Sequence, residues 1–222
     1  MRRQPLVRPA RFILFSHGFG VSAAIYSGLH EELASRGYVV AGIEHTFDAG
    51  AVQFPDGRLV VQKPDIQIDE TLRAVRTADI RFVLDAFGAL AAGRNPDAGH
   101  RRLPAGLGRT LDLKRVGAFG HSLGSPALVA AMERDRRIDV GIVLDGDLVT
   151  TGLDRPFLMI GNQSQRRADS PEWAAFYDNL SGPRLHSSSK GPHMPTSATS
   201  RSLSPRSTLM CLLPVPSTAS AR

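Results

Sequence analysis

The chain has 222 residues, 42% of them hydrophobic, which is enough for one domain with a sizeable core and too little for a second independent domain. Its formal net charge is +6, but nine of the 27 basic residues lie before Glu31, the first acidic residue, or after Asp178, the last one. The stretch between these two residues has 18 basic against 21 acidic residues. The positive balance therefore comes from the two ends, which argues against a nucleic-acid partner.

The sequence contains no pattern that predicts a disulfide, a membrane span or a leader. Cys211 is the single cysteine, so no internal disulfide is possible. No apolar run approaches the roughly 20 residues of a transmembrane helix. The run Phe12–Phe15 is too short for the core of a signal peptide. The sequence as written predicts a cytoplasmic protein, or a secreted one if a segment is missing from its N-terminus.

Short apolar runs alternate with helical patterns along most of the chain. Each run is short and continuous, as expected of a strand that is buried on both faces. Strands are predicted at Phe12–Phe15, Tyr38–Ile43, Val116–Phe119, Val140–Leu144 and Pro156–Ile160. This alternation predicts an α/β fold with a mostly parallel central sheet and helices on both faces.

The segments between these strands have patterns of their own. Leu29 and Leu33 fit one face of a helix, and residues 69–90 form a long amphipathic pattern that predicts a crossover helix before the strand at Val116. Turn residues between β-branched stretches predict a hairpin flap over Val52–Val61. A Gly/Pro/Arg-rich loop is predicted at Asn95–Gly108.

The pattern Gly-x-Ser-x-Gly, centred on Ser122, stands where a predicted strand meets a predicted helix. A nucleophile in this position needs a sharp, strained turn, and glycine two residues before and after the serine leaves room for it. The backbone N–H of Leu123 then lies at a helix N-terminus, where it can stabilise an oxyanion. The alternative is a glycine-rich turn without catalysis. We predict that Ser122 is a nucleophile.

A second oxyanion donor is expected in the loop after an earlier strand that runs beside the nucleophile strand. The segment Ser16–Gly20 fits this place, with the backbone N–H of Phe19 as the donor. We expect the His17 ring to pack or form a hydrogen bond within this loop, not to act as the base.

The acid of a catalytic triad should follow the serine at the end of a later strand. Asp145 comes directly after the predicted strand that follows the Ser122 turn, and the next strand ends in Gly161 with no carboxylate at its tip. Asp145 is the preferred acid. Asp147 and Asp169 are weaker candidates, and a turn role for Asp145 remains the alternative.

The base should be a histidine late in the chain, and only His186 and His193 follow Asp145. His186 falls where a strand is expected. His193 follows a Lys-Gly-Pro turn and is the preferred base. We expect the other histidines, His30, His45, His100 and His121, to be structural or solvent-exposed.

These motifs together resemble a known family. The sequences FSHGFG at 15–20, EH at 44–45, GHSLG at 120–124 and LDG at 144–146 are similar to those of the platelet-activating factor acetylhydrolase-like α/β-hydrolases. The resemblance extends from about Arg11 to Leu185. It implies a serine esterase or lipase that cleaves short acyl esters, including the sn-2 acetyl or short acyl groups of phospholipids. It implies no cofactor and no metal, and no Cys/His/carboxylate cluster has metal-ligand spacing. The alternative is an inactive fragment that serves as a binding module or has no function.

The composition changes sharply near residue 186. From His186 to Arg222 there are 10 Ser, 5 Pro and 4 Thr and no acidic residue, a composition that favours disorder. We therefore expect a hydrolase domain over 1–185, incomplete at both ends, and a disordered, aberrant tail over 186–222. One hypothesis for the change is a shift of reading frame near His186, which the nucleotide sequence would decide.

Overall fold

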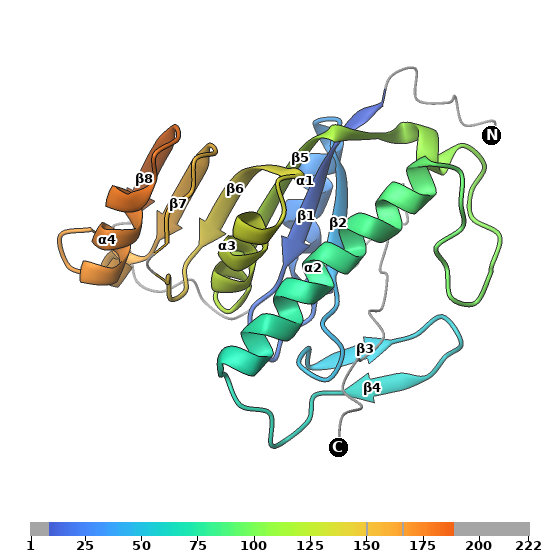
Figure 1. The fold of residues 1–222 in the computed structure, drawn as a ribbon. Coiled ribbons are helices and arrows are strands. Elements are labelled where there is room, and N and C mark those ends of the chain that lie inside the picture. Colours follow the sequence, from blue (N-terminus) through green and yellow to red (C-terminus); the bar gives the residue numbers. More distant parts are fainter. Residues whose placement is uncertain (1–8, 150, 166, 189–222) are drawn as a thin grey trace.

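The computed structural model describes residues 9–149, 151–165 and 167–188. Six parallel strands form one sheet in the order β2-β1-β5-β6-β7-β8 (Figure 1). Their bounds are β1 Ala10–Ser16, β2 Val39–Ile43, β5 Leu111–His121, β6 Ile138–Leu144, β7 Phe157–Gly161 and β8 Arg184–Ser188. A separate antiparallel hairpin consists of β3 Ala51–Gln53 and β4 Leu59–Val61.

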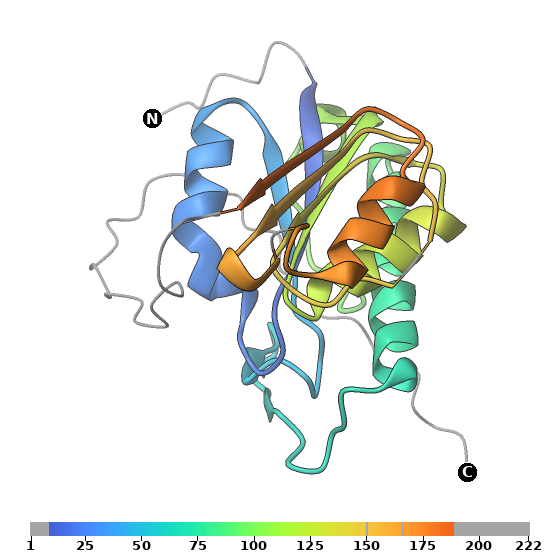
Figure 2. The same ribbon diagram turned by 90° about the vertical axis from the view of Figure 1, so that its left-hand side faces the viewer.

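The sheet lies between two helical layers. The α-helices are α1 Ser27–Ser35, α2 Glu70–Ala91, α3 Gly124–Arg134 and α4 Pro171–Asn179. Figure 2 shows α1 on one face of the sheet and α2, α3 and α4 on the other. Short 3₁₀ turns at Ala23–Tyr26, Leu107–Thr110 and Gln163–Gln165 complete the described elements. Helices on both faces of a parallel sheet confirm the predicted α/β architecture.

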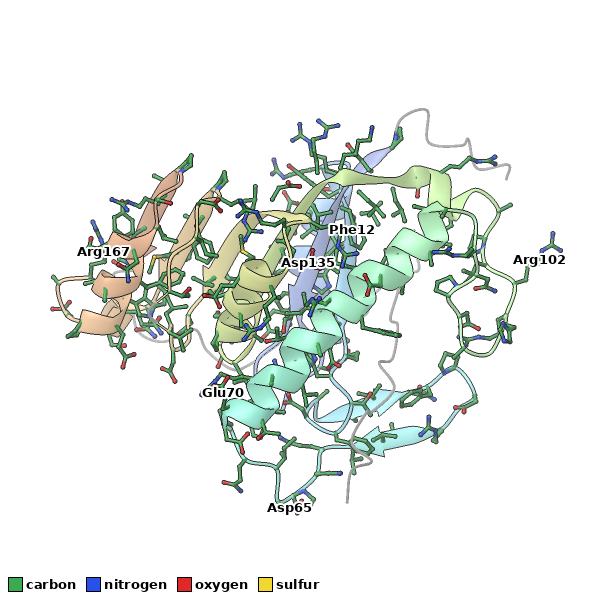
Figure 3. The ribbon with its side chains drawn as sticks, in the orientation of Figure 1. Phe12, Asp65, Glu70, Arg102, Asp135 and Arg167 are labelled. Atoms are coloured by element: carbon green, nitrogen blue, oxygen red, sulfur yellow. The ribbon has the colours of Figure 1, made fainter. Side chains whose placement is uncertain are left out.

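The long helix α2 packs across the sheet as its apolar pattern predicts. The side chain of Asp69 accepts a hydrogen bond from the N–H of Leu72 and so caps the first turn. In the core, Phe87 of α2 lies against Phe12 of β1, with 4.4 Å between ring centroids. In Figure 3, the label of Phe12 lies behind α2, and the label of Glu70 marks the residue at which that helix begins. The same core continues beneath α3 and α4 through Met132 and Trp173.

The structure contains every predicted strand, the crossover helix and the hairpin flap. It also contains β8, which pairs in parallel with β7 and extends three residues past the predicted domain end at residue 185. Leu185 is the single large apolar residue of β8, so neither alternation nor an apolar run marked it as a strand. The edge of β7 supplies the hydrogen bonds that hold β8 extended.

The sheet order brings three loops to one edge. β5 lies between β1 and β6, and all three strands run in parallel. Their carboxyl ends therefore lie side by side, with Ser16 paired to Gly120 and His121 paired to Leu144. Residues that follow these strands are therefore neighbours in space although they lie far apart in the sequence. In an α/β sheet, this edge is where ligands bind.

One buried histidine makes the stability of the domain depend on pH. His30 of α1 packs beside Phe15 and Phe119, and neither of its ring nitrogens has a hydrogen-bond partner. Burial lowers its pKa to about 4. Between this value and the ordinary 6.5, the unfolded chain binds a proton that the folded chain does not. The free energy of unfolding should therefore fall as the pH drops from 7 towards 4.

Substitution of His30 by leucine should remove the part of this dependence that His30 contributes. We expect the free energy of unfolding of His30→Leu, minus that of wild type, to be about 1–2 kcal/mol larger at pH 5 than at pH 8. Urea unfolding of both proteins at the two pH values measures this change. An equal difference at both values would show that His30 is protonated in the folded state as readily as in the unfolded one.

Candidate active site

Ser122 occupies a strained turn between β5 and α3. Its φ is 51°, in the left-handed region that residues other than glycine rarely adopt. A Cβ on Gly120 would overlap the carbonyl of Gly124, and a Cβ on Gly124 would overlap the carbonyl of Ser16. Both glycines are therefore required by close backbone contacts, which is the reason the sequence analysis gave for the pattern.

The turn is joined to the neighbouring strand β6. The N–H of Ser122 donates to the carbonyl of Leu144 over 3.1 Å. The hydroxyl of Ser125 lies 3.0 Å from the carbonyl of Gly120 and 2.7 Å from that of Asp145. Gly146, with a φ of 101°, leaves space for the carbonyl of Ser122. The turn at Ser122 and the turn at Asp145 thus form one packed unit.

The loop after β1 lies against the Ser122 turn. A Cβ placed on Gly18 would lie 3.4 Å from the Cβ of Ser122 and 3.0 Å from Nδ1 of His121. On the other side, Leu123 immediately precedes α3, so its N–H belongs to the first turn of that helix. The two predicted oxyanion donors, Phe19 and Leu123, therefore belong to segments that flank Ser122.

Tyr26 connects this loop to the Ser122 turn, and the sequence analysis did not identify it. Its hydroxyl lies 2.7 Å from Nδ1 of His121. It also forms a hydrogen bond with the backbone of Gly18, while burial raises its pKa. Burial lowers the pKa of His121, although the nearby charge of Asp145 opposes that effect. His121 is thus a neutral ring that packs beside the nucleophile, as expected of a structural histidine.

The carboxylate of Asp145 is held by three donors. Its oxygens accept from the N–H of Gly146 over 2.7 Å, from Nδ2 of Asn162 over 2.9 Å and from Nε2 of Gln165. The φ of Asp145 is 60°, so the residue is in the left-handed region like Ser122. Asp and Asn tolerate this region better than most residues do. The structure places Asp145 at the end of β6, where the sequence analysis put the acid.

The two histidines proposed as the base differ in their placement. His193, the preferred base, lies outside the described residues. His186 is on β8, with its ring 5.7 Å from that of Trp173. Its Nε2 is buried and has no hydrogen-bond partner. Burial lowers its pKa. The ring of His186 packs beside α4, and an interaction with the backbone of Gln165 partly opposes the effect of burial on its pKa.

A second set of Ser, His and Asp side chains lies behind the loop. Ser16 Oγ is 2.9 Å from His45 Nε2, and His45 Nδ1 is 2.7 Å from Asp79 Oδ2. Burial holds the pKa of His45 well below its usual value and raises that of Asp79 to about 7. These three hydrogen-bonded side chains have the connectivity of a catalytic triad. Ser16 is only 2% exposed and His45 only 1%, so no substrate reaches them. The role of these three side chains is therefore structural.

The loop itself is held by buried polar groups. Nδ1 of His17 donates to the carbonyl of Gly18 over 2.6 Å, as expected for a ring that bonds within the loop. Burial is the main cause that lowers the pKa of His17 to about 3, so this ring is neutral. Arg76 of α2 donates to the carbonyls of His17 and Gly18, and its charge is paired with Asp48. Neither residue was predicted from the sequence. Arg76 lies on a helix whose pattern showed only its apolar face, and Asp48 lies outside the motifs.

The described residues contain neither a metal cluster nor a membrane-spanning helix. Within the described residues, no three His, Cys, Asp or Glu side chains are arranged to hold a metal ion. No helix in the described part of the chain is both long and apolar enough to cross a membrane.

A parallel sheet, a positive-φ serine at a strand-to-helix turn and an aspartate after the next strand define the α/β-hydrolase fold. A family described as "Platelet-activating factor acetylhydrolase, isoform II" matches residues 8–73. A ferulic acid esterase from Streptomyces cinnamoneus superposes with a TM-score of 0.66 and 32% identity, over 82% of this chain and 52% of that one. The chain has the α/β-hydrolase fold, and its sequence is similar to those of platelet-activating factor acetylhydrolases.

Curated relatives support this family. A probable 1-alkyl-2-acetylglycerophosphocholine esterase of Arthroderma benhamiae is 28% identical over 187 residues, which are 78% of this chain and 43% of the relative. A platelet-activating factor acetylhydrolase of Cavia porcellus is 26% identical over 188 residues, covering 74% of this chain and 43% of that protein. The chain thus spans less than half the length of these relatives.

Proposed function

We propose that this chain is the catalytic part of a serine carboxylic-ester hydrolase that cleaves short acyl esters. The observation that carries the proposal is the strained Ser122 turn, which is packed between the loop at Gly18 and the turn at Asp145. A serine held at positive φ between an oxyanion loop and an aspartate has the arrangement of a nucleophile. The names of its relatives, all esterases or acetylhydrolases, agree with ester hydrolysis.

In the proposed reaction, His193 takes the proton of Ser122 and Asp145 orients the imidazole. The Ser122 oxygen attacks the ester carbonyl, and the N–H groups of Phe19 and Leu123 stabilise the oxyanion. Collapse of the tetrahedral intermediate releases the alcohol, which receives a proton from the imidazolium. Water then attacks the acyl-enzyme by the same steps in reverse and releases the acid. No cofactor or metal takes part in this scheme.

The proposed substrates are short acyl esters, including the sn-2 acetyl or short acyl groups of a phospholipid. A phospholipid substrate is supported by the acetylhydrolase relatives, and an ester of an aromatic acid such as ferulic acid is supported by the ferulic acid esterase neighbour. Comparison of kcat/KM for a p-nitrophenyl acetate, a feruloyl ester and a 2-acetyl glycerophosphocholine separates these classes. Turnover of the phospholipid alone would assign the chain to the acetylhydrolase activity.

A fluorophosphonate probe tests the nucleophile directly. The Ser122 oxygen should displace fluoride from phosphorus and retain the phosphonyl group, and peptide mapping should find the label at Ser122. We expect His193→Ala to slow this labelling strongly, while His100→Ala, on a remote loop, should leave its rate unchanged. A folded chain that is labelled at another serine, or not at all, would overturn the proposal. Labelling that is equally fast in His193→Ala would remove His193 as the base.

A further inference from the structure

Arg76 is a buried cation directed at the backbone of one loop. It lies on α2 and is 0% exposed. Its Nη1 donates to the carbonyl of His17, and its Nη2 donates to the carbonyl of Gly18 over 3.3 Å. These carbonyls belong to the loop that packs against Ser122. A guanidinium with five donors in a planar fork can hold two carbonyls at once.

The charge of Arg76 is compensated within the same cluster. Asp48 accepts from Nε and, over 2.8 Å, from Nη2 of the guanidinium, and it is 1% exposed. The backbone carbonyl of Asp48 also accepts from the N–H of Gly20 over 3.2 Å. The pair therefore binds the loop on both sides of Phe19, at the carbonyl of Gly18 and at the amide of Gly20.

We propose that Arg76 is a positioning residue that aims the N–H of Phe19 into the oxyanion site, an inference that rests on the proposed function. The carbonyl of Gly18 and the N–H of Phe19 belong to one peptide unit. In a trans peptide these two groups point in opposite directions. Donors that hold the carbonyl of Gly18 on the α2 side therefore direct the N–H of Phe19 away from α2. If this peptide plane rotated, the N–H of Phe19 would no longer point at the oxyanion.

His17 is a second donor to the same carbonyl. Because the carbonyl of Gly18 can only accept, Nδ1 of His17 carries the proton. Its Nε2 is then an acceptor, and the N–H of His45 donates to it over 3.3 Å. Two donors on one carbonyl also polarise the peptide, which strengthens the N–H of Phe19 as a donor. The loop is thus held in one orientation before any substrate binds.

Comparison of oxygen and sulfur substrates tests this role. Thionoesters place a sulfur, a weak acceptor, where the oxyanion oxygen forms, so an enzyme with an intact oxyanion site strongly prefers the oxoester. The experiment measures kcat and KM for p-nitrophenyl acetate and its thiono analogue with wild type, Arg76→Met, Arg76→Lys and Arg81→Met. Arg81 is a matched control, because it is a half-exposed arginine of the same helix with one weak ion pair.

We expect Arg76→Met to lower kcat for the oxoester by about 10–100-fold with little change in KM, since loss of one oxyanion donor costs about that much or more. The thionoester should lose much less, so the oxo-to-thiono ratio falls. Arg76→Lys should be intermediate and Arg81→Met unchanged. A ratio in Arg76→Met equal to that of wild type would overturn the proposal, because a merely structural role lowers both rates together. If Arg76→Met does not fold, the ratio of Arg76→Lys decides in the same way.

An inactive wild type would refute the proposed function but still leave the positioning of the loop open to test. Hydrogen exchange of the amides of Gly18 and Gly20 in the full chain serves this purpose, with the amides of α3 as the internal reference. Faster exchange in the loop of Arg76→Met, with α3 unchanged, would support the positioning. Unchanged protection of both loop amides would overturn it.

Discussion

Replacement of Ser122 by alanine is expected to lower kcat/KM for a p-nitrophenyl ester by about 10⁵-fold or more, because alanine lacks the hydroxyl that forms the proposed acyl-enzyme. Alanine keeps the size and the positive φ of the site, so the fold should be retained. The matched control is Ser35→Ala, a serine at the exposed end of α1 that should leave turnover unchanged. Substantial turnover in Ser122→Ala would place the nucleophile elsewhere.

The same position should reveal the strain of the turn. At ordinary helix and strand positions glycine is less stable than alanine by about 0.5–1 kcal/mol. A non-glycine residue in the left-handed region costs about 1–2 kcal/mol, a cost that glycine avoids. We therefore expect Ser122→Gly to unfold at the same or a higher urea concentration than Ser122→Ala. A clearly less stable glycine variant would show that the turn at Ser122 is not strained.

Replacement of Asp145 by asparagine is expected to lower kcat by about 10⁴-fold, because an amide cannot stabilise the imidazolium that forms during attack. Asparagine tolerates a φ of 60° better than most residues other than glycine do. In the wild type, Gly146, Asn162 and Gln165 all donate to the Asp145 carboxylate. The NH₂ group of the asparagine variant would face one of these donors and could not accept its hydrogen bond. Loss of one such bond should reduce the free energy of unfolding by about 1–3 kcal/mol.

Asp147→Asn is the control for this loss of activity. Asp147 is two residues further along the same loop, is exposed, and was the weaker candidate for the acid. Its substitution should change kcat less than twofold to threefold, a range within ordinary surface effects of about 0.5 kcal/mol. A larger loss in Asp147→Asn than in Asp145→Asn would reverse the assignment of the acid.

The buried Ser16–His45–Asp79 chain shows why sequence motifs alone do not locate a site. Its three side chains have the residue types and hydrogen-bond order of a triad. Ser122 and Asp145, in contrast, have no direct side-chain bond to each other among the contacts of the described residues. Access decides between the two sets, because Ser16 is buried whereas Ser122 is only half-buried. The candidate nucleophile is therefore defined by backbone geometry and exposure.

The local elements and the two turns that carry Ser122 and Asp145 could be predicted from the sequence alone. Continuous apolar runs predicted the strands, and the glycines at 120 and 124 predicted a turn that their close backbone contacts now explain. These features depend on residues near one another in the chain. Periodicity and turn chemistry report such local constraints directly.

The distant groups that support the site could be identified only from the packing of the elements. The order of β1, β5 and β6 brings the loop at Gly18 beside Ser122, and the inward side of α2 places Arg76 beneath that loop. An arginine in an amphipathic helix is normally predicted to be solvent-exposed. The spacing of residues in the sequence therefore could not predict that Arg76 is buried against backbone carbonyls and Asp48. Long-range polar contacts depend on how the elements pack, and packing leaves no periodic pattern in the sequence.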